Sequence, residues 1–296
     1  MSNETPASPS TLAVVPLPGL HLDSLGLGLA ALGLMTLLNR KWPNVKACWR
    51  DGCFVVVHGP TSISEILETV TSSESEGKLQ EYGVARGKKS KALWFDAQKL
   101  DSDSVLTTSR NSAMWRAFQC DEASLALHGS HIAFHEGLAF NPVFGTGGNA
   151  GARIFAEGWF DAKFAIKKLS EKKAGADLLR LGLEAFLTGF EVEHPKYPKR
   201  RSSQKSFGWN LGCWFGSANK AFNSGTAKPF REGMLTPWAM LLACESFGLF
   251  QGSPSRRLGS ARWGTVAFPF VTAGASPTAS GEGGKNLGEL WLPVWE

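Results

Sequence analysis

Residues 25–39 read Leu-Gly-Leu-Gly-Leu-Ala-Ala-Leu-Gly-Leu-Met-Thr-Leu-Leu-Asn, and this run predicts a helix enclosed within a core. Apolar residues fall on nearly every face of such a helix, which is typical of an element buried on all sides. Asp23 or Ser24 precedes the run as a candidate N-cap. The apolar stretch 25–38 is too short to span a bilayer, so we expect a soluble fold built around this helix.

A β-hairpin is predicted directly after this helix, over residues 46–57. Asp51-Gly52 suits a two-residue hairpin turn, which would place Arg50 opposite Cys53 and Cys48 opposite Val55. This register argues against a disulfide between the two cysteines. Beyond the hairpin, Ser62 and Glu65 form a capping-box pattern that predicts a helix to about residue 70.

The second half of the chain predicts helices at 156–173 and 176–190, separated by Gly175. Thr236-Pro237 predicts the start of a further helix to about residue 250, and residues 265–271 resemble a strand. Helices and strands alternate too irregularly for a doubly wound sheet. We therefore expect an α+β fold of mixed, irregular architecture, with a glycine-rich loop between a strand region and a helical region.

Three regions are expected along the chain: a disordered tail at 1–15, an N-terminal α+β region at 16–150 that ends in the glycine loop, and a helical, Gly/Trp-rich region at 151–296 containing a basic loop at 194–208. Lys and Arg outnumber Asp and Glu by 31 to 26, a mild excess that speaks to partners rather than to fold. The five cysteines contain no Cys-x-x-Cys motif and suit a reducing, cytoplasmic environment.

The glycine loop, residues 141–151, concentrates four glycines and two asparagines among apolar residues. It departs from the spacing of a dinucleotide-binding fingerprint and lacks the Lys-Ser/Thr ending of a Walker A loop. Two interpretations stay open: a tight structural turn, or a nest of backbone N–H groups that meets a phosphate or a neighbouring subunit. The candidate contact residues are Asn141, Gly145, Thr146, Gly147, Gly148, Asn149 and Arg153.

Clustered positive charge supplies the candidate nucleic-acid contacts. The basic loop carries five Lys and Arg residues between positions 194 and 205 with no acidic residue among them, and its prolines disfavour a helix. Such a run is usually a solvated surface and can instead be a phosphate contact; the family resemblance described below favours contact. Lysines also line the helix expected after the glycine loop, where a solvated face is an equally good interpretation. The candidates are Lys196, Lys199, Arg200, Arg201, Gln204, Lys205, Lys163, Lys167, Arg256 and Arg257.

Catalytic patterns are scarce. His128, His131 and His135 would share a face only on a helix, whereas the flanking glycines favour a strand, so we expect no metal site. The sequence shows no nucleophile elbow, no His-Glu-x-x-His motif and no cysteine with an evident histidine partner. We therefore expect a protein that is not an enzyme and that holds no cofactor.

The glycine loop and several other motifs resemble one family, the large subunit of the subtype I-U CRISPR effector (Cascade) complex, now called I-G. The family's loop reads roughly Asn-Pro-apolar-x-Gly-Ser/Thr-Gly-Gly-Asn-x-Gly. Further likenesses, in matching order, are Leu17-Pro18-Gly19-Leu20, Cys48-Trp49-Arg50-Asp51-Gly52, Pro237-Trp238, Ala267-Phe268-Pro269-Phe270 and Trp291-Leu292-Pro293-Val294-Trp295. The chain departs from the pattern at Ala150, where the family usually has Asp, and a typical member continues well past the final Trp motif.

The resemblance implies a non-catalytic subunit of a type I RNA-guided surveillance complex. Such a subunit recognises the protospacer-adjacent motif, begins R-loop formation and presents the opened DNA to a helicase-nuclease recruited in trans. Its implied partners are guide RNA, target DNA, and the backbone and guide-processing subunits, with no membrane. The alternative is a stand-alone RNA-binding or RNA-processing protein.

Overall fold

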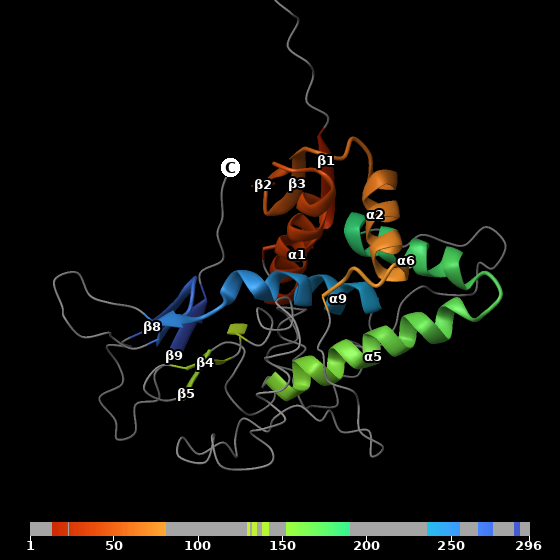
Figure 1. The fold of residues 1–296 in the computed structure, drawn as a ribbon. Coiled ribbons are helices and arrows are strands. Elements are labelled where there is room, and N and C mark those ends of the chain that lie inside the picture. Colours follow the sequence, from red (N-terminus) through yellow and green to blue (C-terminus); the bar gives the residue numbers. More distant parts are fainter. Residues whose placement is uncertain are drawn as a thin grey trace, which may run out of the picture.

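The computed structural model describes residues 14–22, 24–80, 129–130, 132–134, 138–141, 152–189, 236–254, 266–274 and 287–290. Their elements, in chain order, are β1 (Val15–His21), α1 (Leu25–Lys41), β2 (Lys46–Arg50), β3 (Cys53–His58), α2 (Ile63–Ser75), β4 (Ile132–Phe134), β5 (Leu138–Phe140), α5 (Ala152–Ser170), α6 (Gly175–Thr188), α9 (Pro237–Ser246), the 3₁₀ turn η5 (Phe247–Phe250), β6 (Ser253–Pro254), β7 (Val266–Ala267), β8 (Val271–Gly274) and β9 (Leu287–Leu290) (Figure 1). The expected mixture of α and β structure is confirmed.

The main sheet is antiparallel with strand order β1-β3-β2, and the remaining described strands form three pairs, β4 with β5, β6 with β7 and β8 with β9. Asp51 and Gly52 connect β2 to β3 with φ of 51° and 76°, the positive values that a type I′ turn requires. Arg50 pairs with Cys53 and Cys48 with Val55, so the predicted register is confirmed. Cys48 and Cys53 are free thiols, as the register implied.

Strand β1 was absent from the sequence prediction because Pro16 and Pro18 disfavour a strand interior. In the structure β1 lies at the edge of the sheet and pairs only with β3 among the described strands. Its pairing jumps from Leu17 to His21, so the residues between them leave the ladder. There Gly19 approaches the end of α6 so closely that an added Cβ would lie 2.0 Å from the Phe186 carbonyl oxygen.

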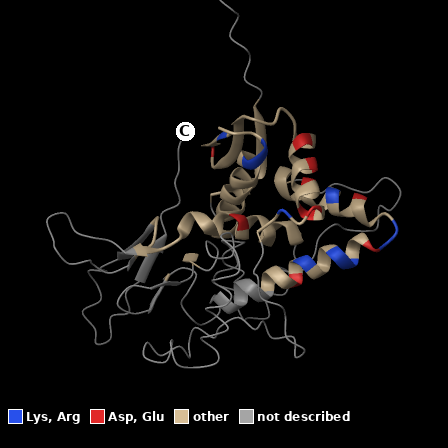
Figure 2. Cartoon of the chain, in the orientation of Figure 1, with Lys and Arg blue, Asp and Glu red and all other residues tan. Residues whose placement is uncertain are grey.

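Helices α1 and α9 pack directly on each other and form the most extensive contact between elements in the described part of the chain. Charged residues are confined to the ends of both helices: Arg40 and Lys41 in α1, and Glu245 in α9 (Figure 2). Gly33 lies at the contact, where a Cβ would fall 1.7 Å from the Leu242 carbonyl oxygen. The predicted burial of this helix on nearly every face is confirmed, and its N-cap is Ser24.

The other predicted helices are found with shifted boundaries. Ser62 Oγ accepts a hydrogen bond from the Glu65 amide at 3.3 Å, although α2 continues to Ser75, beyond the predicted end. The Glu65 carboxylate accepts from the Thr61 amide at 2.7 Å, so the reciprocal half of the capping box is displaced by one residue. Helix α5 begins at Ala152, earlier than predicted, and Gly175 begins α6.

The expected single strand at 265–271 is wrong. Residues 266–267 form β7 and 271–274 form β8, and the chain turns between them with Phe270 at φ 59°. The helix predicted from Pro237 starts as expected but ends at Ser246, with its final turn tightened into η5. Pro269 lies in the turn between β7 and β8, so this part of the chain forms two short strands, each paired with a different partner strand, instead of one longer strand.

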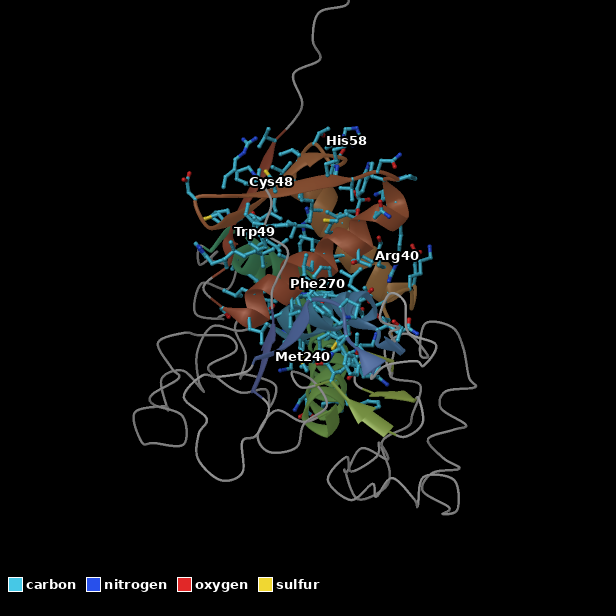
Figure 3. All side chains as sticks on the ribbon, turned by 90° about the vertical axis from the view of Figure 1, so that its left-hand side faces the viewer. Arg40, Cys48, Trp49, His58, Met240 and Phe270 are labelled. Carbon is cyan, nitrogen blue, oxygen red and sulfur yellow. The ribbon has the colours of Figure 1, made fainter. Side chains whose placement is uncertain are left out.

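One hydrophobic core includes residues from both regions expected from the sequence, from Val15 in β1 to Phe250 in η5. Figure 3 shows side chains filling the space between the sheet and α9, with α1 between them. Helix α6 contacts β1, and α5 contacts α9. None of the helices in the described part of the chain combines the length and apolarity that crossing a membrane demands.

Candidate functional site

Most of the predicted contact residues lie outside the described part of the chain. This holds for the basic-loop residues between 196 and 205, for Arg256 and Arg257, and for the glycine-loop residues 145–149. Arg153 falls in the first turn of α5, where only the backbone is described. Asn141, Lys163 and Lys167 can therefore be placed with their side chains.

Asn141 follows β5 and is fully buried. Its amide nitrogen Nδ2 donates to the backbone carbonyl of Ser130 at 2.9 Å. The Gly252 amide donates a hydrogen bond to the Gly129 carbonyl at 3.0 Å. This bond joins the residues before β4 to the segment after η5. Asn141 thus anchors the entrance to the glycine loop, and its side chain is engaged within the protein.

Lys163 and Lys167 line an open groove between the end of α2 and α5, with a volume of about 520 Å³. We call it the α2–α5 groove. Ile166, which is buried, and the half-buried Phe160 supply its apolar surface. Its remaining described lining residues are Glu74, Ser75, Phe164 and Ser170. The sequence pattern identified the two lysines but gave no indication that α2 would form the opposite wall.

The ammonium group of Lys163 is held inside the groove. Its Nζ lies 3.1 Å from Glu74 Oε1, and the side chains are only 21% and 19% exposed respectively. The same Nζ lies 6.0 Å from the centroid of the Trp159 ring, within the range of a cation–π contact. Because water is partly excluded there, this pair fixes α5 against α2 more effectively than a solvated surface pair would.

Phe164 and Lys167 occupy the open side of the groove. Phe164 is 62% exposed, the highest exposure among the described large hydrophobic residues. Lys167 is exposed one helical turn further on, and residues three apart on a helix share a face. The groove therefore presents an aromatic ring beside a solvated cation.

Positive charge continues from the groove to the end of α5 and its turn into α6, seen as blue ribbon in Figure 2. Lys168, Lys172 and Lys173 are exposed there. Asp161 and Glu171 are the acidic residues of this stretch, so lysines outnumber acids by five to two between positions 158 and 175. Because Lys163 is paired with Glu74, four exposed lysines remain against two exposed acids between these positions, and such an excess attracts polyanions.

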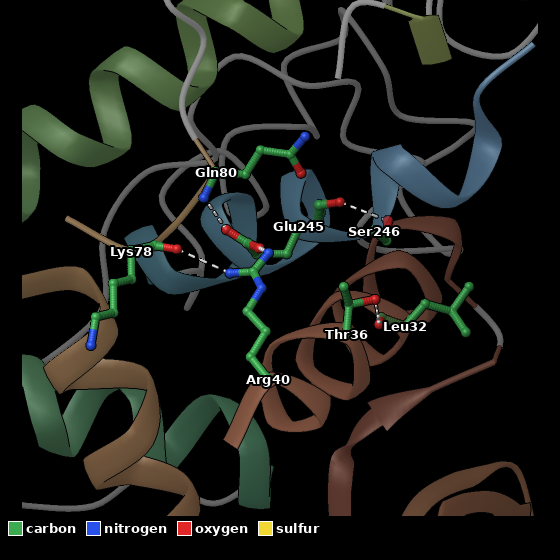
Figure 4. Close-up of polar contacts among 8 residues, drawn as sticks. Leu32, Thr36, Arg40, Lys78, Gln80, Glu245 and Ser246 are labelled. Carbon is green, nitrogen blue, oxygen red and sulfur yellow. Dashed lines mark hydrogen bonds and ion pairs between the residues drawn. The ribbon is translucent and has the colours of Figure 1, made fainter. Parts of the chain in front are cut away.

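A second polar cluster is structural (Figure 4). Glu245 is buried in α9. Its Oε2 accepts a hydrogen bond from Arg40 Nη2 at 2.6 Å, and its Oε1 accepts one from the backbone amide of Gln80. Arg40 Nη1 also donates to the Lys78 carbonyl at 3.0 Å. Burial raises the pKa of Glu245, and the Arg40 charge opposes that rise. The cluster joins α1, α9 and the segment after α2, and its members are too far apart in sequence for a local pattern to reveal it.

The structure also corrects the expectation that no cysteine has a histidine partner. Cys53 Sγ lies 3.7 Å from His21 Nδ1, because the interrupted pairing of β1 brings His21 opposite Cys53. Both side chains are partly exposed. Among the described residues, however, no group of three or more His, Cys, Asp and Glu side chains is arranged to hold a metal.

Comparisons with protein-family models, with curated proteins and with solved structures found no match.

Proposed function

We propose that this chain is a non-catalytic, nucleic-acid-binding subunit of a CRISPR RNA-guided surveillance complex, related to the large subunit of subtype I-U/I-G. The observation that carries nucleic-acid binding is the lysine-rich surface of α5 beside the α2–α5 groove. Phosphates are the ligands that such a surface recognises without regard to sequence. The order of the sequence motifs supports the particular kind of complex.

In this role the subunit recognises a short motif in duplex DNA and helps to open the strands, while the guide RNA reads the target by base pairing. The basic loop at 194–208 and the α5 lysines are the proposed phosphate contacts. The glycine loop, entered through the buried Asn141, is the proposed contact with RNA, DNA or a neighbouring subunit.

Co-purification tests the proposal. The tagged full chain is co-expressed with a guide array and with the backbone and guide-processing subunits of a subtype I-G complex. We expect the chain to retain guide RNA together with those subunits. Recovery of RNA without them would favour a stand-alone RNA-binding protein, and recovery of a small ligand alone would favour an enzyme.

The proposal also predicts that the purified chain neither cleaves DNA nor hydrolyses ATP, because strand cutting is assigned to the recruited helicase-nuclease. The assay uses labelled duplex and single-stranded DNA with Mg²⁺ or Mn²⁺, and released phosphate reports ATP hydrolysis. Cleavage abolished by Cys53→Ser or His21→Ala would contradict the non-catalytic assignment, since these variants remove the thiol–imidazole pair of the described structure.

A further inference from the structure

Phe164 is an unusual residue for a solvated helix face. A phenylalanine ring exposed to 62% leaves apolar area in water that burial would stabilise. The described residues give Phe164 no ring contact, whereas Phe160, one turn earlier, packs edge-to-face on Trp159 at a centroid distance of 4.9 Å. The Phe160 ring is thus held against Trp159 in the wall of the groove, whereas the Phe164 ring is exposed to solvent.

The charges around this ring define what can cover it. Lys167 and Lys168 follow Phe164 by three and four positions, so they lie on its side of the helix one turn away. Both are exposed, and neither forms an ion pair with a described residue. On the opposite wall the Glu74 carboxylate is paired with Lys163, so its negative charge is offset within the groove.

We infer that the α2–α5 groove binds a single-stranded segment of nucleic acid, with a base stacked on Phe164 and the neighbouring phosphate held by Lys167. Aromatic rings beside cationic side chains are how proteins bind single strands without sequence preference. A duplex does not satisfy the ring in the same way, because the faces of its bases are already stacked on one another. This inference rests on the proposed function and specifies the ligand of one of its surfaces.

The test measures the affinity of the full chain for labelled oligothymidylate and for a duplex of equal length, each over a series of salt concentrations. Phe164→Leu keeps an apolar side chain and removes the aromatic face, and Phe164→Tyr restores that face. Phe270→Leu is the control for loss of a partly exposed ring elsewhere: Phe270 lies in the turn between β7 and β8, and its ring packs edge-to-face on Phe250 at a centroid distance of 5.7 Å.

We expect Phe164→Leu to weaken oligothymidylate binding by roughly tenfold, the loss of one stacked base, with little change for the duplex. The salt slope should be unchanged in this variant because no charge is lost. Lys167→Ala should instead lower the magnitude of the single-strand slope by about 0.7. Phe164→Tyr and Phe270→Leu should bind like the wild type.

Two outcomes would overturn the inference while leaving the proposed function intact. One is a chain that retains guide RNA and binds duplex DNA, yet binds oligothymidylate equally well with Phe or Leu at position 164. The other is a Phe164→Leu variant that loses a protein subunit of the complex but keeps its single-strand affinity, which would assign the groove to a protein partner. A wild-type chain that binds neither RNA nor DNA would instead overturn the proposed function itself.

Discussion

At the scale of single residues, Glu245 shows how a charge is accommodated inside this protein. Its carboxylate is buried, and it is satisfied by the Arg40 guanidinium and the Gln80 amide. Removing a charge from water costs free energy that an ion pair repays only in part. Arg40 keeps contact with solvent, since its side chain is 44% exposed. The pair is therefore expected to order the segment after α2 more than to add stability.

Glu245→Gln should lower the free energy of unfolding near neutral pH by only about 1 kcal/mol. The amide oxygen still accepts from the Gln80 backbone N–H, and the bond from Arg40 is lost, but Arg40 can turn to solvent and the cost of burying a charge disappears. Burial raises the Glu245 pKa, so the folded state binds this proton more tightly than the unfolded state. Wild-type stability relative to the variant should thus be greatest at low pH and fall as pH rises through the raised pKa. Urea denaturation between about pH 4 and 8 measures this difference. If the stability of the wild type relative to Glu245→Gln instead grew with pH, the Glu245 pKa would not be raised in the folded state.

At the scale of elements, the contact between α1 and α9 depends on backbone approach. Gly33 has no Cβ, and this lets the Leu242 carbonyl come within a distance that no side chain could tolerate. The two nearest atoms belong to the Leu242 backbone and cannot rotate away. Gly52 offers a contrast, since its φ is 76° but open space surrounds the position of its missing Cβ.

Gly33→Ala should therefore lower the free energy of unfolding by about 3 kcal/mol, the upper part of the range for overpacked cores. Gly52→Ala should cost only about 1–2 kcal/mol, the strain of a left-handed alanine. Denaturant midpoints of the two variants provide the comparison. If the two variants lost equal free energy of unfolding, or if Gly52→Ala lost more, α1 and α9 could move apart to accommodate the added methyl group at little cost.

The elements differed in how much of them the sequence could predict. The Asp51-Gly52 turn, Ser62 and Thr236-Pro237 act through local backbone chemistry, and the structure places each where the sequence predicted it. Strand β1 was missed because its prolines are tolerated only at a sheet edge, a position that the sequence does not reveal. The wall of the α2–α5 groove, the Glu245 cluster and the His21–Cys53 contact depend on residues distant in the chain. They required the tertiary structure.

At the scale of the whole molecule, one core crosses the boundary expected near residue 150. Helix α1 is buried against α9, and β1 rests on α6. Helix α1 and strand β1, from the N-terminal region, therefore bury apolar surface against helices from the C-terminal region. The division into two regions thus describes the order of motifs along the sequence, and it stays a prediction as a division into folding units.

Separate expression of residues 1–150 and 151–296 checks this point. We expect neither fragment alone to show cooperative unfolding, because each loses one side of the α1–α9 contact. Mixing the fragments should restore a single transition. Circular dichroism during thermal unfolding gives the readout, and a cooperative transition in either isolated fragment would show that it has a core of its own.

The salt dependence of binding shows whether the α5 surface holds nucleic acid through its phosphates. Replacing Lys167, Lys168 and Lys172 together by alanine removes exposed charges that form no ion pair with a described residue, so the fold should not be weakened. For duplex DNA each lost phosphate contact lowers the slope of log affinity against log salt by roughly 0.9. We predict that the triple variant loses about 2–3 from the magnitude of that slope, whereas a slope and an affinity equal to those of the wild type would contradict the claim.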